Sequence, residues 1–292
     1  MRMTHVFHMT SGDSAGAALA RSGVPGEVFV WHDILYDGPR EPGWPTDEIL
    51  EARARFIESE TGGGLDAGDV RRTLDEQYRK LATASEYDKT VLWFDACLFD
   101  QAMLCHILAR MLERNITNVE LLCVDAFDGI EPYDGIGQLS PAQLASVYDD
   151  RTPVTQARFA YAAEVDAAFA TRDVGALTAF SQADDAPLRW VPAAAHRWLQ
   201  ERPSPDTGLG RLHSLVMEAL ADGHATPEAI LAYVRDADGH PRYWSDFMLW
   251  AKINGLADRT PPLVKIDGPV DHLPQWEEHV SPSEFRVTAV GG

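Results

Sequence analysis

Polar residues with the potential for chemistry follow four apolar, strand-like segments of the chain. The segments at residues 4–9, 27–31, 90–94 and 119–124 lead, in that order, into Ser11, Gly12, Asp13 and Ser14; His32 and Asp33; Asp95; and Asp125. In open α/β sheets, ligands bind outside the carboxyl ends of the strands. We therefore expect four carboxylates and one imidazole to share a rim of the sheet. For each residue alone, the alternative is a helix cap or a turn.

The turn at residues 12–16 (GDSAG) indicates a ligand site, although it is not a standard phosphate motif. A glycine turn ahead of a helix exposes backbone N–H groups that bind anions. The turn matches neither GxGxxG nor a P-loop, because no Gly-Lys-Ser/Thr follows it. Asp13 would repel a bare phosphate and suits a hydroxyl, an amine or a metal that bridges to phosphate. Gly-Asp-Ser esterases share this triplet, but their later Gly-x-Asn-Asp and Asp-x-x-His blocks are missing here.

Carboxylate oxygens are the ligands that Mg²⁺ prefers. Asp13, Asp33, Asp95 and Asp125 are the residues that could supply them at the expected rim. The chain has no His-x-x-x-His, Cys-x-x-Cys or EF-hand spacing. Solvated acids at strand ends explain the same residues equally well, so the sequence leaves the cofactor open, with Mg²⁺ as the one candidate.

The elements that must position these residues alternate between strands and helices. Helix-forming segments at residues 15–22, 46–60, 66–85 and 98–112 separate the four strands. Such alternation predicts parallel βαβ units with right-handed crossovers. Residues 1–140 are therefore predicted to form a Rossmann-like α/β domain with a parallel sheet.

Two further segments follow this domain. Residues 141–207 are predicted to be helical. Ser140 and Pro141 indicate the start of one helix, and Thr152 and Pro153 indicate the start of a second. Two more helices are predicted at 173–182 and 187–201. Residues 208–292 are predicted to hold three helices, at 209–221, from Thr226 to about 235, and at 243–257. Strands at 263–266 and 285–290 complete the order of a winged-helix-like α+β domain.

Composition excludes several classes of protein. The net charge is −20, from 25 basic and 45 acidic residues, which counts against binding to nucleic acid phosphates. No apolar run reaches the roughly 18 residues of a membrane span, and the start of the chain has no signal-peptide pattern. Three cysteines, Cys97, Cys105 and Cys123, indicate a reducing compartment rather than a disulfide framework. We therefore expect a cytoplasmic protein.

Several blocks together resemble a known bacterial family. They are residues 5–14 (HVFHMTSGDS), 30–33 (VWHD), 37–39 (DGP), 92–95 (LWFD), 99–101 (FDQ) and 135–140 (GIGQLS), and they resemble the family catalogued as domain of unknown function 1835. The resemblance covers roughly residues 4–200, and the part from Gly208 on resembles the companion C-terminal domain often found with this family. The family has no established activity, so the resemblance implies architecture more than function.

Its motif residues correspond to Gly12, Asp13, Ser14, Asp33, Gly38, Pro39, Trp93, Asp100, Gln101, Gly137 and Gln138. Two positions depart from it: His32 stands where the family often has arginine, and Cys97 where it often has an acid.

The leading hypothesis is a small-molecule binding protein that takes a nucleotide-like or phosphorylated ligand at the strand ends. Its expected ligand-binding residues are Gly12, Asp13, Ser14, Asp33, Asp95, Asp100, Gln101, Gly137 and Gln138. The sequence leaves open whether the protein is an enzyme; if it is, His32 or Asp33 is the candidate base. The alternative is a non-catalytic regulator whose C-terminal domain contacts a partner protein or, less readily, nucleic acid. A homodimer is also open.

Overall fold

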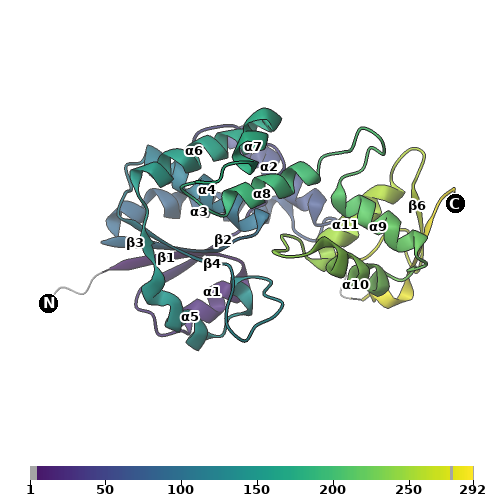
Figure 1. Ribbon diagram of the computed structural model, residues 1–292, viewed down its shortest axis with the longest axis horizontal. Coiled ribbons are helices and arrows are strands. Elements are labelled where there is room, and N and C mark those ends of the chain that lie inside the picture. The colour runs from purple at the N-terminus through teal and green to yellow at the C-terminus, as the bar shows by residue number, and fades with distance from the viewer. Residues whose placement is uncertain (1–4, 277–278, 292) are drawn as a thin grey trace. The chain divides into compact units, whose positions relative to one another are not determined.

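The computed structural model describes residues 5–276 and 279–291 and contains a five-stranded sheet of order β2-β1-β3-β4-β5 (Figure 1). The strands are β1 (Val6–Ser11), β2 (Glu27–Trp31), β3 (Lys89–Asp95), β4 (Val119–Val124) and β5 (Thr152–Pro153). The first four are mutually parallel and β5 is antiparallel to β4. The predicted α/β class and parallel pairing are confirmed for these four strands; Thr4, predicted to begin the first, lies outside the described residues.

The strand order places a topological switch between β1 and β3. From β1 the chain passes through α1 (Asp13–Ala20) to β2, and it returns to β3 through α2 (Asp47–Glu60) and α3 (Ala67–Ala82). Helix α1 lies on one face of the sheet with α5 (Pro141–Val147), while α4 (Leu98–Glu113) and α6 (Gln156–Thr171) pack together on the other (Figure 1). Where strand order reverses in a doubly wound sheet, a crevice opens beyond the carboxyl ends of the strands. Here that crevice begins at Ser11 and Asp95.

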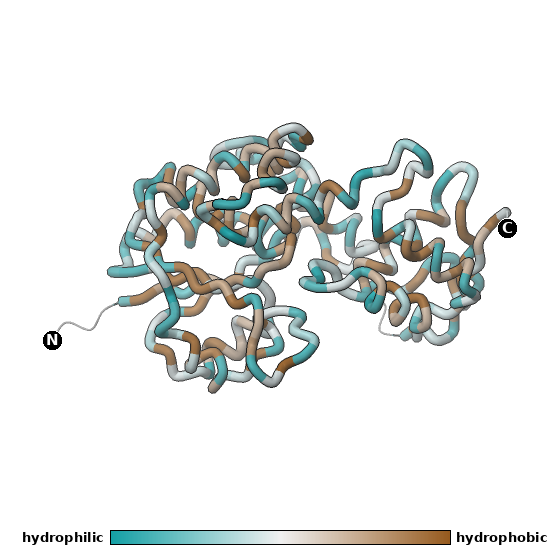
Figure 2. Tube along the Cα trace, viewed as in Figure 1, coloured by the Kyte–Doolittle hydropathy of each residue, from teal (hydrophilic) through white to brown (hydrophobic). Residues whose placement is uncertain are grey.

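The centre of the sheet is buried on both sides, as its apolar sequence predicts. All six residues of β1 are buried, and Figure 2 shows apolar residues concentrated along the central strands. The imidazole of His8 lies inside this core, where Trp93 Nε1 donates to its Nδ1 (3.1 Å) and its Nε2 lies 3.2 Å from the Pro25 carbonyl. Burial lowers the pKa of His8, which favours the neutral ring that this arrangement requires.

Thr152 and Pro153 form β5 and do not begin a helix, so that prediction was wrong. They pair with Glu120 and Leu121 of β4, and the Val154 amide donates to the Val119 carbonyl (2.8 Å). Helix α6 begins at Gln156, capped by the Thr155 hydroxyl. The proline at 153 resembles a helix-start signal locally, but an edge strand accepts proline equally well because one side of its backbone needs no partner.

The contacts divide the chain into two compact units. The first comprises the described residues up to Ala54 together with Arg71–Arg197 and His240–Tyr243; the second comprises Arg55–Val70, Trp198–Gly239 and the described residues from Trp244 on. Helices α5, α6 and α7 (Val174–Ser181), predicted as a separate segment, thus belong to the first unit. Most of α8 (Val191–Gln200) does so too.

The second unit contains the three helices and the strand pair that the sequence predicts. They are α9 (Arg211–Ala221), α10 (Pro227–Asp238), α11 (Asp246–Ala257) and the antiparallel strands β6 (Val264–Asp267) and β7 (Arg286–Ala289). The predicted cap of α10 is present, since the Thr226 hydroxyl accepts from the Ala229 amide. Across the described ranges of the chain, no helix combines the length and apolar character needed to cross a membrane.

A buried ionic network ties the helical layer of the first unit to the loop after β2. The Asp166 carboxylate of α6 pairs with Arg40, accepts from Arg110 Nη2 (3.2 Å) and lies 3.1 Å from His106 Nδ1. The Tyr78 hydroxyl lies 2.7 Å from the other nitrogen of His106. Burial alone would raise the pKa of Asp166, but the neighbouring His106 and Arg40 hold it well below its usual range.

We expect Asp166→Asn to lower the free energy of unfolding by about 3–5 kcal/mol, because it removes the carboxylate that pairs with the buried Arg40 and leaves the buried Arg110 to pair with the partly exposed Glu113. A carboxyl group whose pKa is depressed in the fold contributes stability above its unfolded pKa, about 4, and loses it as pH falls. The deficit of the variant should therefore shrink in acid. Urea unfolding at pH 7 and at about pH 3, below the unfolded pKa, measures both effects. The exposed Asp184→Asn is the control; a variant as stable as this control at pH 7 would contradict the network.

Candidate functional site

A cavity of about 290 Å³ opens at the carboxyl ends of β1 and β3, inside the first unit. Its walls come from the turn into α1, from the end of β3 and from the loop after β4. The lining residues are Ser11, Gly12, Asp13, Ser14, Ala15, Asp95, Asp134, Gly135, Ile136, Gly137 and Gln138. The cavity therefore lies at the switch point of the sheet, where the strand order predicts ligand binding.

The first turn of α1 faces this cavity with its backbone N–H groups. Gly12 is the N-cap, with φ +72° and ψ 140°, and no side chain caps the helix. The first helical bond runs from the Gly16 amide to the Gly12 carbonyl (3.1 Å), so the amides of Asp13, Ser14 and Ala15 precede the helical ladder. Uncapped amides and the positive end of the helix dipole together form a site suited to an anion or a polarised oxygen.

A pair of buried acids forms the floor. Asp100 accepts from the Ser11 hydroxyl at Oδ1 (2.6 Å) and from the Asp95 amide at Oδ2 (2.7 Å), while Asp95 Oδ1 accepts from the Cys97 amide (2.9 Å). Asp100 is 2% exposed and Asp95 is 8% exposed. One carboxyl group thus connects the end of β1 to the end of β3 and fixes the spacing of the cavity walls.

Burial changes the protonation of these acids. It raises the pKa of Asp95, and burial together with the neighbouring Asp95 charge raises the pKa of Asp100 well above its usual range. A carboxyl group in its neutral form can donate a hydrogen bond and does not repel an anion. The floor of the cavity is therefore less negative than its two acids suggest.

The loop after β4 approaches this floor closely. A Cβ atom at Gly135 would lie 2.4 Å from Asp95 Oδ2, and the φ of Gly135 is +136°, so no other residue fits there without a shift of the loop. Beside it, the Tyr133 hydroxyl is buried and makes no hydrogen bond within the described part of the chain. Burial, followed by the charge of Asp95, raises the pKa of Tyr133, which keeps its proton available for donation.

The cavity brings together most of the predicted ligand-binding residues. Gly12, Asp13, Ser14, Asp95, Gly137 and Gln138 line it. Asp100 and Gln101 lie beneath it, where Gln101 Nε2 donates to the Asp95 carbonyl (2.6 Å). Asp134 also lines it but was not predicted, because an Asp-Gly pair in a loop reads as an ordinary turn.

Asp33 pairs with Arg53 and is not among the residues that line the cavity. Its side chain is fully buried, and its carboxylate accepts from Arg53 Nε at 3.1 Å and from Arg53 Nη2 at 2.5 Å. Arg53 also donates to the carbonyls of Ile34 and Pro39, so the pair fixes the loop after β2. A buried carboxylate with this partner has a structural role and is poorly placed to act as a base.

The four predicted magnesium ligands are not assembled by the described residues. Asp125 accepts from Arg189 Nη2 (2.9 Å) and Trp190 Nε1 (2.8 Å), and Asp33 pairs with Arg53. Over residues 5–276 and 279–291, the one group with metal-binding spacing is Asp95, Cys97 and Asp100. Its atoms already accept backbone N–H groups of the turn into α4, where Cys97 is the N-cap.

His32 lies at the rim beside Asp13. Its Nε2 is 2.9 Å from Asp13 Oδ1, and the two side chains are 45% and 88% exposed. The His32 amide donates to Gln77 Oε1 (2.5 Å), which fixes the backbone from which the imidazole projects. An imidazole oriented by a carboxylate is a common arrangement for moving a proton.

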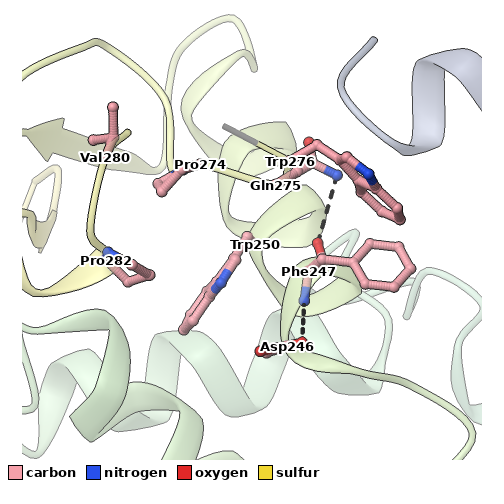
Figure 3. Close-up of a pocket in the computed structure, with 8 residues that line it drawn as sticks. All are labelled: Asp246, Phe247, Trp250, Pro274, Gln275, Trp276, Val280 and Pro282. Carbon is pink, nitrogen blue, oxygen red and sulfur yellow. Dashed lines mark hydrogen bonds between the residues drawn. The ribbon is translucent and has the colours of Figure 1, made fainter. Parts of the chain in front are cut away.

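A larger cavity of about 450 Å³ lies in the second unit (Figure 3). Figure 3 shows the rings of Phe247 and Trp276 on one side of α11 and Trp250 on the other; the first two meet edge-on at 5.1 Å. Among the lining residues that the structure describes, Asp246 is the one acid, and it accepts from the Phe247 amide (2.9 Å). This described part of the lining offers aromatic surface but no convergent polar groups, so the strand-end cavity is the stronger candidate despite its smaller volume.

Comparison with models of known protein families gives no match, and comparison with curated proteins gives none either. The geometry of the site therefore carries the functional argument.

We expect Asp100→Asn to be at least as stable as the unchanged protein at pH 7. The amide oxygen can accept from the Asp95 N–H and the amide nitrogen can donate to the Ser11 hydroxyl oxygen, so both contacts are kept with the direction of one reversed, but the amide cannot ionise. A carboxyl group whose pKa is raised in the fold favours stability below its unfolded pKa, about 4, and loses this contribution as pH rises toward the folded pKa. The advantage of the variant should therefore grow from pH 4 to pH 7. Asp100→Ala removes both acceptors and should lower the free energy of unfolding by about 2–3 kcal/mol. Equal losses for both variants in thermal unfolding would refute the neutral-acid assignment.

Proposed function

We propose that this protein binds a small nucleotide-like or phosphorylated molecule in the strand-end cavity. The observation that carries the proposal is the uncapped first turn of α1, which opens into a cavity at the switch point of a doubly wound sheet. A volume of about 290 Å³ is near the lower end for ligand cavities, which run from about 300 to 1,000 Å³. A mononucleotide or a phosphorylated metabolite suits this size better than a dinucleotide does.

Each of the three acids that line the cavity has a feature that limits repulsion. The Asp13 side chain is 88% exposed to solvent and hydrogen-bonds to His32, Asp134 pairs with Arg242, and burial raises the pKa of Asp95. An anionic group at the amides of α1 would therefore meet less repulsion than the formal charges suggest. Asp13 remains exposed enough to accept hydrogen bonds from hydroxyl groups, as the ribose of a nucleotide would offer. If the bound molecule reacts, the His32–Asp13 pair is the group placed to move a proton.

The alternative, a non-catalytic regulator whose C-terminal domain contacts a partner, receives less support. It requires an uncovered apolar face on the helix at residues 243–257, yet the stripe of α11 formed by Leu249, Trp250, Ile253 and Leu256 is buried. The resemblance to domain of unknown function 1835, the winged-helix-like character of the second unit and a cytoplasmic location remain parts of the proposal. The order of three helices and a strand pair in the second unit supports the winged-helix-like part of this proposal.

We expect wild-type protein to bind AMP and inorganic phosphate, and Gly12→Ala to weaken both affinities about tenfold. At φ +72° a Cβ atom strains the turn, although nothing lies within 4 Å of it; the amides of α1 must then shift. Gly129→Ala is the matched control, because Gly129 has φ +83°, equally open surroundings and no place in the cavity lining. Isothermal titration calorimetry measures the affinities. The proposal fails if a panel of mononucleotides and sugar phosphates neither binds nor raises the melting temperature, or if both glycine variants bind alike.

A further inference from the structure

The segment His240–Tyr243 connects two helices of the second unit but packs within the first. It lies between α10, which ends at Asp238, and α11, which begins at Asp246. Gly239 and Trp244, on either side of the segment, belong to the second unit, whereas residues 240–243 make their contacts within the first. A four-residue excursion of this kind needs favourable contacts to offset the entropy of ordering it.

Tyr243 provides one anchor for the segment. Its side chain is 6% exposed, its ring meets the ring of Tyr36 edge-on at 5.2 Å, and the Arg197 guanidinium lies 4.9 Å from its centre. Tyr36 in turn meets Phe99 of α4 at 6.3 Å, one residue before Asp100. The anchor is thus built on the same helix start that holds the floor of the cavity.

Arg242 and His240 hold the wall of the cavity from outside. Arg242 Nε donates to Asp134 Oδ1 (3.0 Å), Arg242 Nη2 pairs with Oδ2, and His240 Nδ1 lies 3.0 Å from Oδ1. The Arg242 side chain is 12% exposed and that of Asp134 is 31% exposed. A two-pronged guanidinium–carboxylate pair fixes direction as well as distance, and partial burial protects it from screening by salt.

Asp134 connects its ion pair with Arg242 to the rest of the cavity wall. Its own amide donates to Gln138 Oε1 (2.5 Å), which closes residues 134–138 into a compact turn. The same turn approaches Asp95 through Gly135. Residues 134–138 are therefore held between the acid pair on the inside and Arg242 on the outside.

We propose that Arg242 and His240 are positioning residues for the wall of the cavity, and that occupancy of the cavity is coupled to the order of the segment His240–Tyr243. This inference rests on the proposed function. Arg242 does not touch the ligand; it sets where residues 134–138 stand when the ligand arrives. Because coupling between two sites is reciprocal, a ligand that stabilises the wall also stabilises this segment.

The test uses the full chain and three variants. Arg242→Ala removes the contacts of this guanidinium with Asp134. Arg242→Lys keeps the positive charge but not the paired N–H donors. As a control, Arg235→Ala removes an exposed positive charge from α10. Hydrogen–deuterium exchange without ligand should be about tenfold faster at residues 135–138 in Arg242→Ala. It should be intermediate in Arg242→Lys and unchanged in Arg235→Ala.

Titration with AMP separates this inference from the function on which it rests. We expect Arg242→Ala to bind AMP about five- to tenfold more weakly than wild type, and AMP to slow exchange at residues 242 and 243 of wild type but not of saturated Arg242→Ala. Wild-type exchange and AMP affinity in Arg242→Ala would overturn the inference and leave the proposed function standing. Failure of inorganic phosphate and of the whole panel of mononucleotides and sugar phosphates to bind wild type would overturn the proposed function and the coupling, while the ligand-free exchange at residues 135–138 would still decide whether Arg242 positions the wall.

Discussion

The Asp100 carboxyl group holds together the carboxyl ends of two adjacent parallel strands, β1 and β3. It accepts from the Ser11 hydroxyl at the end of β1 and from the Asp95 amide at the end of β3, 84 residues further along the chain. Asp100 is itself placed by the start of α4, where the Cys97 sulfur accepts from its amide (3.5 Å). If this bridge were absent, the Gly12 turn and the β3 end would have to be spaced by strand pairing alone. The position of the α1 amides relative to Asp95 therefore depends on one buried side chain.

The electrostatics of the site differ from those of the chain as a whole. The protein carries a net charge of −20, yet the cavity receives the positive end of a helix dipole. Burial favours the neutral form of the acids on its floor, and the acids on its rim and outer wall face His32 and Arg242. The local field, rather than the total charge, governs what enters a partly buried site, because nearby groups in a low dielectric outweigh distant ones in water.

The strands were predictable because buried parallel strands are continuous apolar runs, and this signal is local. The segments at 27–31 and 119–124 coincide with β2 and β4, and the helix starts at Ser140 and Thr226 carry the caps that their sequences indicate. The packing of residues 240–243 within the first unit had no such local signal in the sequence. Nothing in the letters HPRY shows that Arg242 pairs with Asp134, 108 residues earlier. The same limit explains Thr152 and Pro153, whose strand pairing was decided by β4 and not by their own propensity.

The sequence alone determined that polar residues stand at the ends of the strands, and hence that Gly12, Asp13, Ser14 and Asp95 would share an edge of a parallel sheet. Only the tertiary structure decided which of those polar groups remain available. Asp33 is taken by Arg53 and Asp125 by Arg189 and Trp190, whereas Asp95 opens into the cavity. The reason is physical: alternation of strands and helices follows from short-range periodicity and burial. The partner of a charged side chain depends on groups that are distant along the chain and close in space.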